Sequence, residues 1–365
     1  MSDEAWLRAM LDAERALAVA EERVGVLSRD AAEAVVAACS QELDVAALLE
    51  AGRGAGNPVE PLVRALRESA PRAHWGATSQ DILDTAAALI ARNAVAVIVR
   101  ELDAVAEECA QLAERHRGTV LAARTLLQQA VPTTFGLKAG SWLVGVVHLR
   151  DRLTAARLPA QLGGAAGTLA ALGDRGLEVL RAFAAELDLP EPVLPWHTRR
   201  MPVAELGAEL SVSAGFIAKI ALDIELLAQT EVAEVREAAD GPSSTMPHKR
   251  NPVESTLARA CAIRGQAAAS VLLSSLVQEH ERAAGAWHAE WGALSDALAL
   301  TGGAAAALHG ALEGLEIDTE RMRANIAVET LSEAKRFGID ANKPEDYLGS
   351  ADAFTERALR FYRER

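Results

Sequence analysis

Apolar positions recur at helical spacing along most of this chain. Over residues 1–50 they alternate with charged positions in the manner of two amphipathic helices joined near Gly25. Residues 81–117 are periodic over a longer stretch and predict a single long helix. The same period returns from about residue 207 to residue 239. The pattern therefore predicts an all-α protein built around long packed helices.

Two carboxylates continue the apolar seam of the last of these helices. The seam includes Ile220, Ile224 and Leu227, and its spacing leads on to Glu231 and Glu234. A carboxylate on a packed seam is costly unless it is paired, so the two indicate a polar pocket or a salt link between subunits. A frayed, exposed helix end is the alternative.

Composition favours helices that pack closely. Half of the 365 residues are hydrophobic but only 4% are aromatic, and alanine and leucine supply much of the apolar content. A chain of this length can bury a large core in two or three domains. Helices this apolar are expected to bury their stripes by bundling, also between subunits.

The formal net charge of −14 argues against nucleic acid or an anionic membrane as a partner. Cys39, Cys109 and Cys261 lack metal-ligand spacing, so we expect reduced thiols in a cytoplasmic protein and no metal site. The N-terminus is charged and amphipathic, unlike a signal peptide, and no apolar run is expected to be long enough to span a bilayer.

The loop at residues 241–252 has the side chains for proton transfer beside an anion. It reads Gly-Pro-Ser-Ser-Thr-Met-Pro-His-Lys-Arg-Asn-Pro, and its opening Gly-Pro excludes a continuous helix. Small hydroxyls beside a basic cluster on a glycine-hinged loop suit an anion that is enclosed and then protonated or deprotonated. A solvated basic turn between two helices is the alternative.

A second polar segment, residues 74–81, precedes the first long helix and reads His-Trp-Gly-Ala-Thr-Ser-Gln-Asp. Thr78 or Ser79 would cap that helix, with Asp81 in its first turn. Uncapped amides and small hydroxyls at a helix start also form anion sites. Capping alone explains the hydroxyls but not His74, so a binding role is favoured.

Three further segments have weaker signals. The glycine run at residues 52–58 indicates a turn, because no strand or βαβ unit surrounds it. Residues 162–168 could form an anion nest or a tight helix contact, and the lack of a phosphate-loop lysine favours packing. Arg199 and Arg200 could bind carboxylates bidentately, or lie solvated on the surface.

Together these motifs resemble the aspartase/fumarase superfamily. Residues 241–252 are similar to its signature loop without a gap, although the family usually has a small residue in place of Pro242. The resemblance implies that Ser243 transfers the proton and that His74 binds a carboxylate or shuttles a proton. The substrate-binding residues it implies are Thr78, Ser79, Gln80, Arg124, Gln128, Arg200, Ser244, Met246, Lys249 and Asn251.

The second shared region of the superfamily departs from its pattern here. Residues 124–134 are expected to be extended, and Leu126 stands where lyases of fumarate-type substrates have a histidine. Thr256 stands where they have the supporting glutamate. A hydroxyl or amine leaving group is strongly basic and needs a general acid, whereas a lactone carboxylate leaves with little protonation. The joint loss therefore favours lactone chemistry, as in the muconate cycloisomerase branch, which residues 74–81 and 278–291 also resemble most.

The resemblance implies lactonisation of a small tricarboxylate, 3-carboxy-cis,cis-muconate, with no cofactor or metal. It also implies a three-domain fold with divisions at residues 1–76, 77–310 and a shortened 311–365, and a homotetramer whose active sites are shared between subunits. Another lyase of the superfamily, acting on adenylosuccinate or in another C–N or C–X elimination, is one alternative. A non-catalytic structural homologue is the other.

Overall fold

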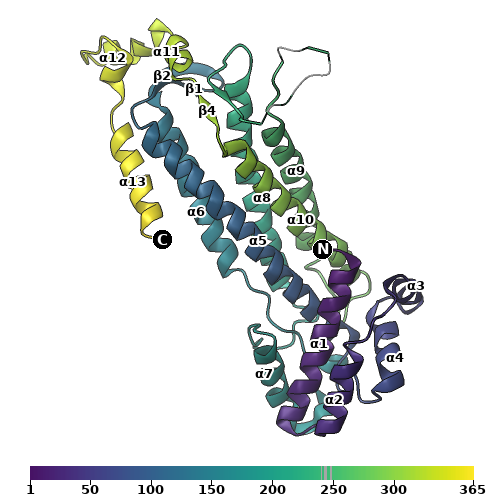
Figure 1. Ribbon diagram of the computed structural model, residues 1–365. Helices are drawn as coiled ribbons and strands as arrows, with labels where there is room; N and C mark the ends of the chain where they lie inside the picture. Colours follow the sequence, from purple (N-terminus) through teal and green to yellow (C-terminus); the bar gives the residue numbers. More distant parts are fainter. Residues whose placement is uncertain (240, 242–244, 247–248) are drawn as a thin grey trace. The chain divides into compact units, whose positions relative to one another are not determined.

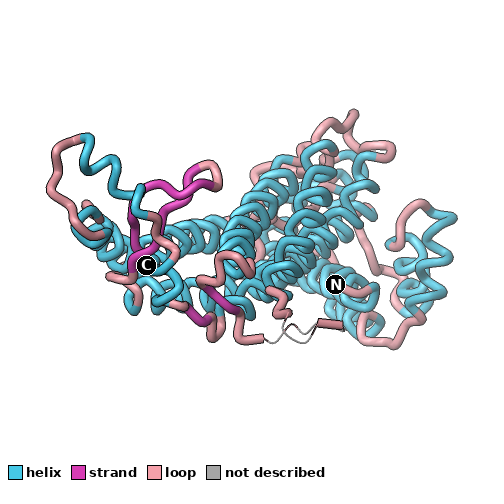
Figure 2. Tube along the Cα trace, turned by 90° about the horizontal axis from the view of Figure 1, so that it is seen from above, coloured by secondary structure: helices cyan, strands magenta, loops and turns pink. Residues whose placement is uncertain are grey.

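The computed structural model describes residues 1–239, 241, 245–246 and 249–365. Helices dominate these residues, and the strands form only two antiparallel pairs, drawn in magenta in Figure 2. The predicted all-α class is confirmed. The chain divides into two compact units, unit 1 of residues 1–96, 155–208 and 267–299 and unit 2 of residues 97–154, 209–266 and 300–365. Four long helices have part of their length in each unit: α5 (Ser79–Arg115), α8 (Met201–Ala228), α9 (Val253–Ser274) and α10 (Ala286–Leu312).

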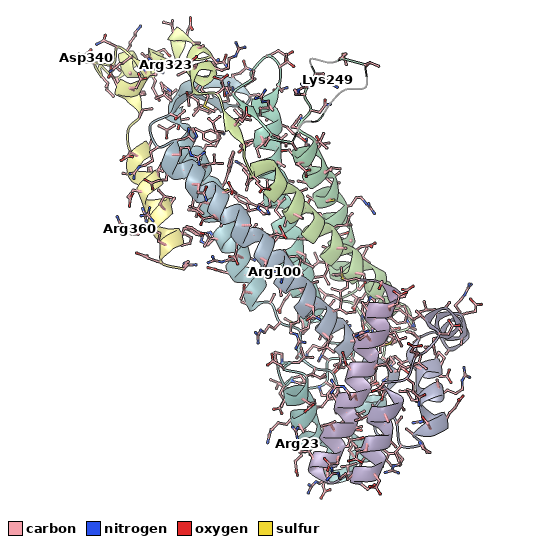
Figure 3. The ribbon with its side chains drawn as sticks, viewed as in Figure 1. Arg23, Arg100, Lys249, Arg323, Asp340 and Arg360 are labelled. Carbon is pink, nitrogen blue, oxygen red and sulfur yellow. The ribbon has the colours of Figure 1, made fainter. Side chains whose placement is uncertain are left out.

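Unit 1 is helical. Its own helices are α1 (Asp3–Val24), α2 (Arg29–Ala38), α3 (Val45–Ala55), α4 (Val59–Ser69) and α7 (Gly176–Glu186), with short 3₁₀ helices at Gly164–Ala166 and Ala170–Arg175. The predicted junction near Gly25 is confirmed, because Gly25 has the left-handed φ of 83° that ends α1. The turn predicted over residues 52–58 begins late: α3 continues to Ala55, and the chain reverses at Gly56. Arg23, labelled in Figure 3, joins α1 to α7 through an ion pair of 2.9 Å with Glu186.

Unit 2 combines long helices with both strand pairs. Its own elements are β1 (Val120–Thr125), β2 (Gln128–Thr134), α6 (Phe135–Ala155), β3 (Val235–Arg236), β4 (Glu316–Ile317), α11 (Thr319–Ala324), α12 (Ser332–Arg336) and α13 (Ala351–Arg363), with 3₁₀ helices at Val328–Leu331 and Pro344–Tyr347. Helices α5 and α6 run side by side in Figure 1. Helix α6 packs closely on α8, because a Cβ at Gly145 would lie 2.0 Å from the ring of Phe216. The indole of Trp142 also donates to Asp223 on α8 at 2.8 Å.

Two predicted elements differ from the structure. Helix α8 ends at Ala228, so Glu231 and Glu234 lie beyond it and not on a continued helical seam. Residues 124–134 are extended as predicted, but they belong to a β-hairpin in which Val120 pairs with Thr134. The prediction of a single extended piece is therefore incomplete.

The expectation about bilayer-spanning runs is also wrong for one helix. Helix α5 is long and apolar enough to cross a membrane by length and composition alone, and 67% of its apolar stretch is buried within the protein. Such burial is typical of a core helix in a soluble protein.

Candidate functional site

The residues that the sequence assigns to the site fall in both units. Unit 1 contains His74, Thr78, Ser79, Gln80 and Arg200, and unit 2 contains Arg124, Gln128, Met246, Lys249 and Asn251. Ser243 and Ser244 lie outside the described residues.

In unit 1, Asp81 is the acceptor that organises the start of α5. Its buried carboxylate accepts the backbone N–H groups of Thr78 at 3.0 Å, Gly163 at 2.9 Å and Gly164 at 2.9 Å. The ring Nε2 of His197 lies 2.7 Å from the same carboxylate. The glycine-rich segment at residues 162–168 thus forms an anion nest whose anion belongs to the chain itself. It is packed as well, because a Cβ on Gly163 would lie 2.8 Å from His197.

Thr78 immediately precedes α5 and was predicted, with Ser79, as a candidate cap of this helix. The side chain that accepts a backbone N–H at the helix start is instead that of Asp81. The hydroxyls of Thr78 and Ser79 form no hydrogen bond with any other residue that the structure describes. Both side chains are half-buried beside the amides that open a long helix. Small unpartnered hydroxyls at a helix N-terminus are suited to a carboxylate, so this end of α5 keeps the character of an anion site.

Gln80 and Arg200 instead form hydrogen bonds and ion pairs inside the buried core of unit 1. Gln80 is fully buried, and its amide donates to Asp84 at 3.1 Å and to the carbonyl of His197 at 2.8 Å. Arg200 is also buried and bonds Asp84 and Glu290, each at 2.6 Å at the shortest. Burial raises the pKa of Glu290, and the Arg200 guanidinium opposes that rise. Because both side chains are buried and already have partners within unit 1, we do not retain Gln80 and Arg200 as substrate ligands.

His74 contacts a buried glutamate, Glu14, on α1. Its Nδ1 is 2.6 Å from Oε1 of Glu14, a side chain with no exposed surface. Glu21 is buried on the same helix, and its pKa is raised to about 8, first by burial and then by the charge of Glu14. The positive charge of Arg72 acts in the opposite direction. Arg72 itself stacks on Trp75, 3.5 Å from the ring centroid.

The raised pKa of Glu21 makes the protein less stable as the pH rises. The folded state keeps the Glu21 proton up to about pH 8, whereas the unfolded chain releases it near 4.5. Between pH 5 and pH 7 the free energy of unfolding is expected to fall by about 2–3 kcal/mol from this group alone, at 1.36 kcal/mol per pH unit. Urea unfolding at pH 5 and at pH 7 should show a smaller change in the free energy of unfolding for Glu21→Gln than for the wild type. An equal slope in the variant and the wild type would contradict this assignment.

In unit 2, Arg124 and Glu234 form a bidentate ion pair near the turn of the β1–β2 hairpin. The two guanidinium–carboxylate distances are 2.9 and 2.6 Å, and Asn325 also donates to Glu234 at 2.9 Å. Glu234 is completely buried, so it occupies a polar pocket, whereas Glu231 is exposed. Gln128 is exposed and pairs with Thr125 next to the hairpin turn.

The signature loop is anchored at both of its ends. The backbone N–H and the side-chain amide of Asn251 donate to the carbonyl of Gly241 at 3.0 and 2.9 Å. Only glycine fits there, because a Cβ at Gly241 would lie 2.3 Å from the carbonyl oxygen of Asn251. Just beyond the loop, the buried carboxylate of Glu237 caps α9 by accepting the N–H groups of Glu254 and Ser255 at 3.1 and 2.9 Å.

A cavity of about 1150 Å³ borders this anchored loop. Basic side chains from the loop and from β3 line part of it, acidic side chains near β4 line another part, and small or apolar residues line much of the remainder. Its lining includes Arg236, Met246, Lys249, Arg250, Asn251, Glu316, Asp318 and Glu320. Lys249, which Figure 3 labels, is an exposed residue of the loop. The residues on the basic side could hold a small polyanion.

Lys138 on α6 was not predicted from the sequence. It forms no hydrogen bond or ion pair with any other described residue, and burial lowers its pKa. The charges that act on it are those of Asp223, Lys219, Arg124 and Glu234. The sequence feature that could have indicated Lys138 is the presence of a lysine among the apolar residues of α6 between Phe135 and Trp142. Among the described residues, no group of three or more His, Cys, Asp or Glu side chains could hold a metal ion.

These features occur in a chain that belongs to the Lyase family, whose sequence profile matches residues 1–266. A 3-carboxy-cis,cis-muconate cycloisomerase of Bradyrhizobium diazoefficiens is 45% identical over 339 residues, which are 89% of this chain and 75% of that protein. A nitrosuccinate lyase of Streptomyces davaonensis is 46% identical over 348 residues, 89% of this chain and 73% of that protein. The crystal structure of the 3-carboxy-cis,cis-muconate lactonizing enzyme of Pseudomonas putida superposes with a TM-score of 0.92 at 36% identity, covering 100% of this chain and 96% of that one. The predicted superfamily is thereby confirmed.

Proposed function

We propose that this protein is a cycloisomerase that converts 3-carboxy-cis,cis-muconate to 4-carboxymuconolactone without a cofactor. The observation that carries the proposal is the similarity to a 3-carboxy-cis,cis-muconate lactonizing enzyme over the whole length of this chain, at a TM-score of 0.92. The similarity to the Bradyrhizobium cycloisomerase supports it from sequence. The reaction would serve protocatechuate degradation in the β-ketoadipate pathway, in the cytoplasm.

The proposed reaction needs a proton donor and fixed acceptors of negative charge. One substrate carboxylate oxygen bonds to a carbon of the substrate's own double bond, and the π electrons move to the neighbouring carbon as an aci-carboxylate. Ser243 donates a proton to that carbon and recovers one from solvent. Thr78, Ser79, Lys249 and Asn251 would hold the developing charge. His74, Arg124, Gln128, Ser244 and Met246 complete the proposed site.

We further propose that the site is completed by other copies of the chain in a homotetramer. In this arrangement residues assigned to unit 1 of one copy and to unit 2 of another would form one site. Large apolar side chains are also exposed on the single chain, among them Leu126, Val193, Val277 and Val328. Exposed apolar side chains of this size are typical of surfaces that another chain covers.

The leaving group separates this chemistry from other eliminations of the superfamily. Leu126 is 96% exposed in a hairpin turn, at the position where fumarate-type lyases have a histidine. Without that histidine the enzyme would lack the general acid that a strongly basic leaving group needs. Nitrite is also a weakly basic leaving group, so a nitrosuccinate lyase is the second candidate, favoured by the 46% identity to the Streptomyces protein.

The test is to offer both substrates to the purified protein. With 3-carboxy-cis,cis-muconate we expect loss of the ultraviolet absorbance of the diene, and with nitrosuccinate little release of nitrite. Nitrite release with an unchanged diene would replace the cycloisomerase by the lyase. No change with either compound would reject both assignments.

A further inference from the structure

Glu14 is a buried carboxylate with one described partner. It has no exposed surface, and its Oε1 lies 2.6 Å from Nδ1 of His74. Its second oxygen, Oε2, is buried and has no hydrogen-bond partner among the described residues. A buried carboxylate with an unpartnered oxygen costs stability, and locally unfavourable groups of this kind are expected mainly at functional or strained sites. The contact with His74 is therefore the candidate for a function of Glu14.

The imidazole of His74 has one engaged end and one open end. The side chain is 11% exposed, and Nε2 contacts no hydrogen-bonding group in the part of the chain that the structure describes. The backbone is held in the left-handed region, with φ of 61° at His74 and 71° at Gly76. Left-handed backbone at a non-glycine residue is uncommon and strained, and such residues cluster at functional sites. The ring is thus fixed from its backbone and from Nδ1, while Nε2 stays available.

We propose that Glu14 is the positioning residue of His74, accepting its Nδ1–H so that the ring presents Nε2 to the substrate. The inference deepens the proposed function, in which His74 contacts the substrate, and it rests on that function for its catalytic consequence. An ionised carboxylate only accepts hydrogen bonds, so the neutral ring carries its proton on Nδ1. Nε2 is then the unprotonated ring nitrogen, which can accept a proton and, once protonated, donate to a substrate carboxylate.

Glu21 provides a matched control on the same helix. It is also a buried glutamate, it has no described bond to His74, and one of its oxygens is likewise unpartnered. Because its pKa is about 8, it is mostly neutral at pH 7, and Glu21→Gln changes little charge. If replacing any buried acid on α1 lowered the activity, both variants would lose activity. If the positioning of His74 is what matters, only Glu14→Gln would lose activity.

The kinetic test compares Glu14→Gln, Glu21→Gln, His74→Asn and the double variant Glu14→Gln/His74→Asn at pH 7. Glutamine in place of Glu14 can donate to Nδ1 and shift the ring to the wrong tautomer, so kcat/KM should fall about tenfold to a hundredfold. Glu21→Gln should stay within about twofold. In the His74→Asn background, Glu14→Gln should cost nothing more, because the two residues act as a unit. Additive losses, or an unaffected Glu14→Gln, would overturn the inference.

A spectroscopic readout separates failure of this inference from failure of the proposed function. ¹⁵N NMR of the full-length protein labelled at histidine, with His74→Asn for assignment, reports which ring nitrogen of His74 carries the proton. We expect the Nδ1–H tautomer in the wild type and its loss in Glu14→Gln. A wild-type Nε2–H tautomer would refute the positioning role. An Nδ1–H tautomer in a protein that converts neither substrate would keep the role and reject the function.

Discussion

Replacing Ser243 with alanine is expected to lower kcat on 3-carboxy-cis,cis-muconate by about 10²- to 10⁴-fold, with little change in stability. Positioned proton transfer contributes rate enhancements of this size. The substitution removes the only atom that the proposed mechanism uses to protonate the carbanion, and leaves the carboxylate ligands Lys249 and Asn251 in place. The effect should therefore fall on kcat more than on KM. Following the diene absorbance at saturating substrate measures it directly.

Ser274→Ala is the control for this variant. Ser274 is an exposed serine on α9 whose hydroxyl, among the described residues, bonds only a backbone carbonyl of its own helix, so its loss should leave kcat unchanged. If Ser243→Ala converts the substrate as fast as the wild type, the substrate assignment stands and Ser243 is not the proton donor. His74 would then be the first other group to test as the proton donor.

Replacing Arg200 with methionine is expected to lower the free energy of unfolding by about 3–5 kcal/mol. Arg200, Asp84 and Glu290 are all buried, and the guanidinium bonds each carboxylate at 2.6 Å at the shortest. Methionine fills similar space but leaves two carboxylates buried without their counter-charge, and breaking a buried pair in this way costs about that much. Other donors remain, such as the indole of Trp287 on Asp84 at 2.9 Å, but they are neutral. Urea unfolding at pH 7 measures the loss.

Arg152→Met is the matched comparison. Arg152 bonds Glu209 at 2.6 Å, the same distance as in the buried pairs, but this arginine is exposed. Exposed ion pairs contribute less than about 1 kcal/mol, so Arg152→Met should be nearly neutral. Similar losses in the two variants would mean that burial does not determine the cost at Arg200.

The sequence predicted the long helices well, because their apolar period is set locally and does not depend on distant partners. It missed the β1–β2 hairpin for a local reason. The turn is made by Leu126 and Leu127, with φ of 50° and 65°, and turns of this kind usually use asparagine or glycine. A pair of leucines does not predict a turn. The strain they carry is tolerated at a tip where both side chains are largely exposed.

Long-range partners explain what the sequence could not predict in the site. Arg200 lies in a motif that suits carboxylate binding, and nothing local indicates that its carboxylates are Asp84 and Glu290 of the same unit. Likewise the pairing of Glu234 with Arg124 joins segments far apart in the chain. The polar segments at residues 74–81 and 241–252 could be identified from their composition, but their assignment to one site came from the resemblance to a family. The roles of its residues, and the three-domain division, stay predictions.

Asp81 also determines which solutes the segment at residues 162–168 can receive. The amides of Gly163 and Gly164 face a carboxylate that is tethered in the same unit, and a tethered ligand is present at an effective concentration that few free ions reach. Phosphate or sulfate in a buffer therefore competes poorly for these amides. Inhibition of the enzyme by such ions would report on the start of α5 or on the basic side of the cavity near Lys249, which makes simple inorganic anions useful probes of the substrate-binding groups.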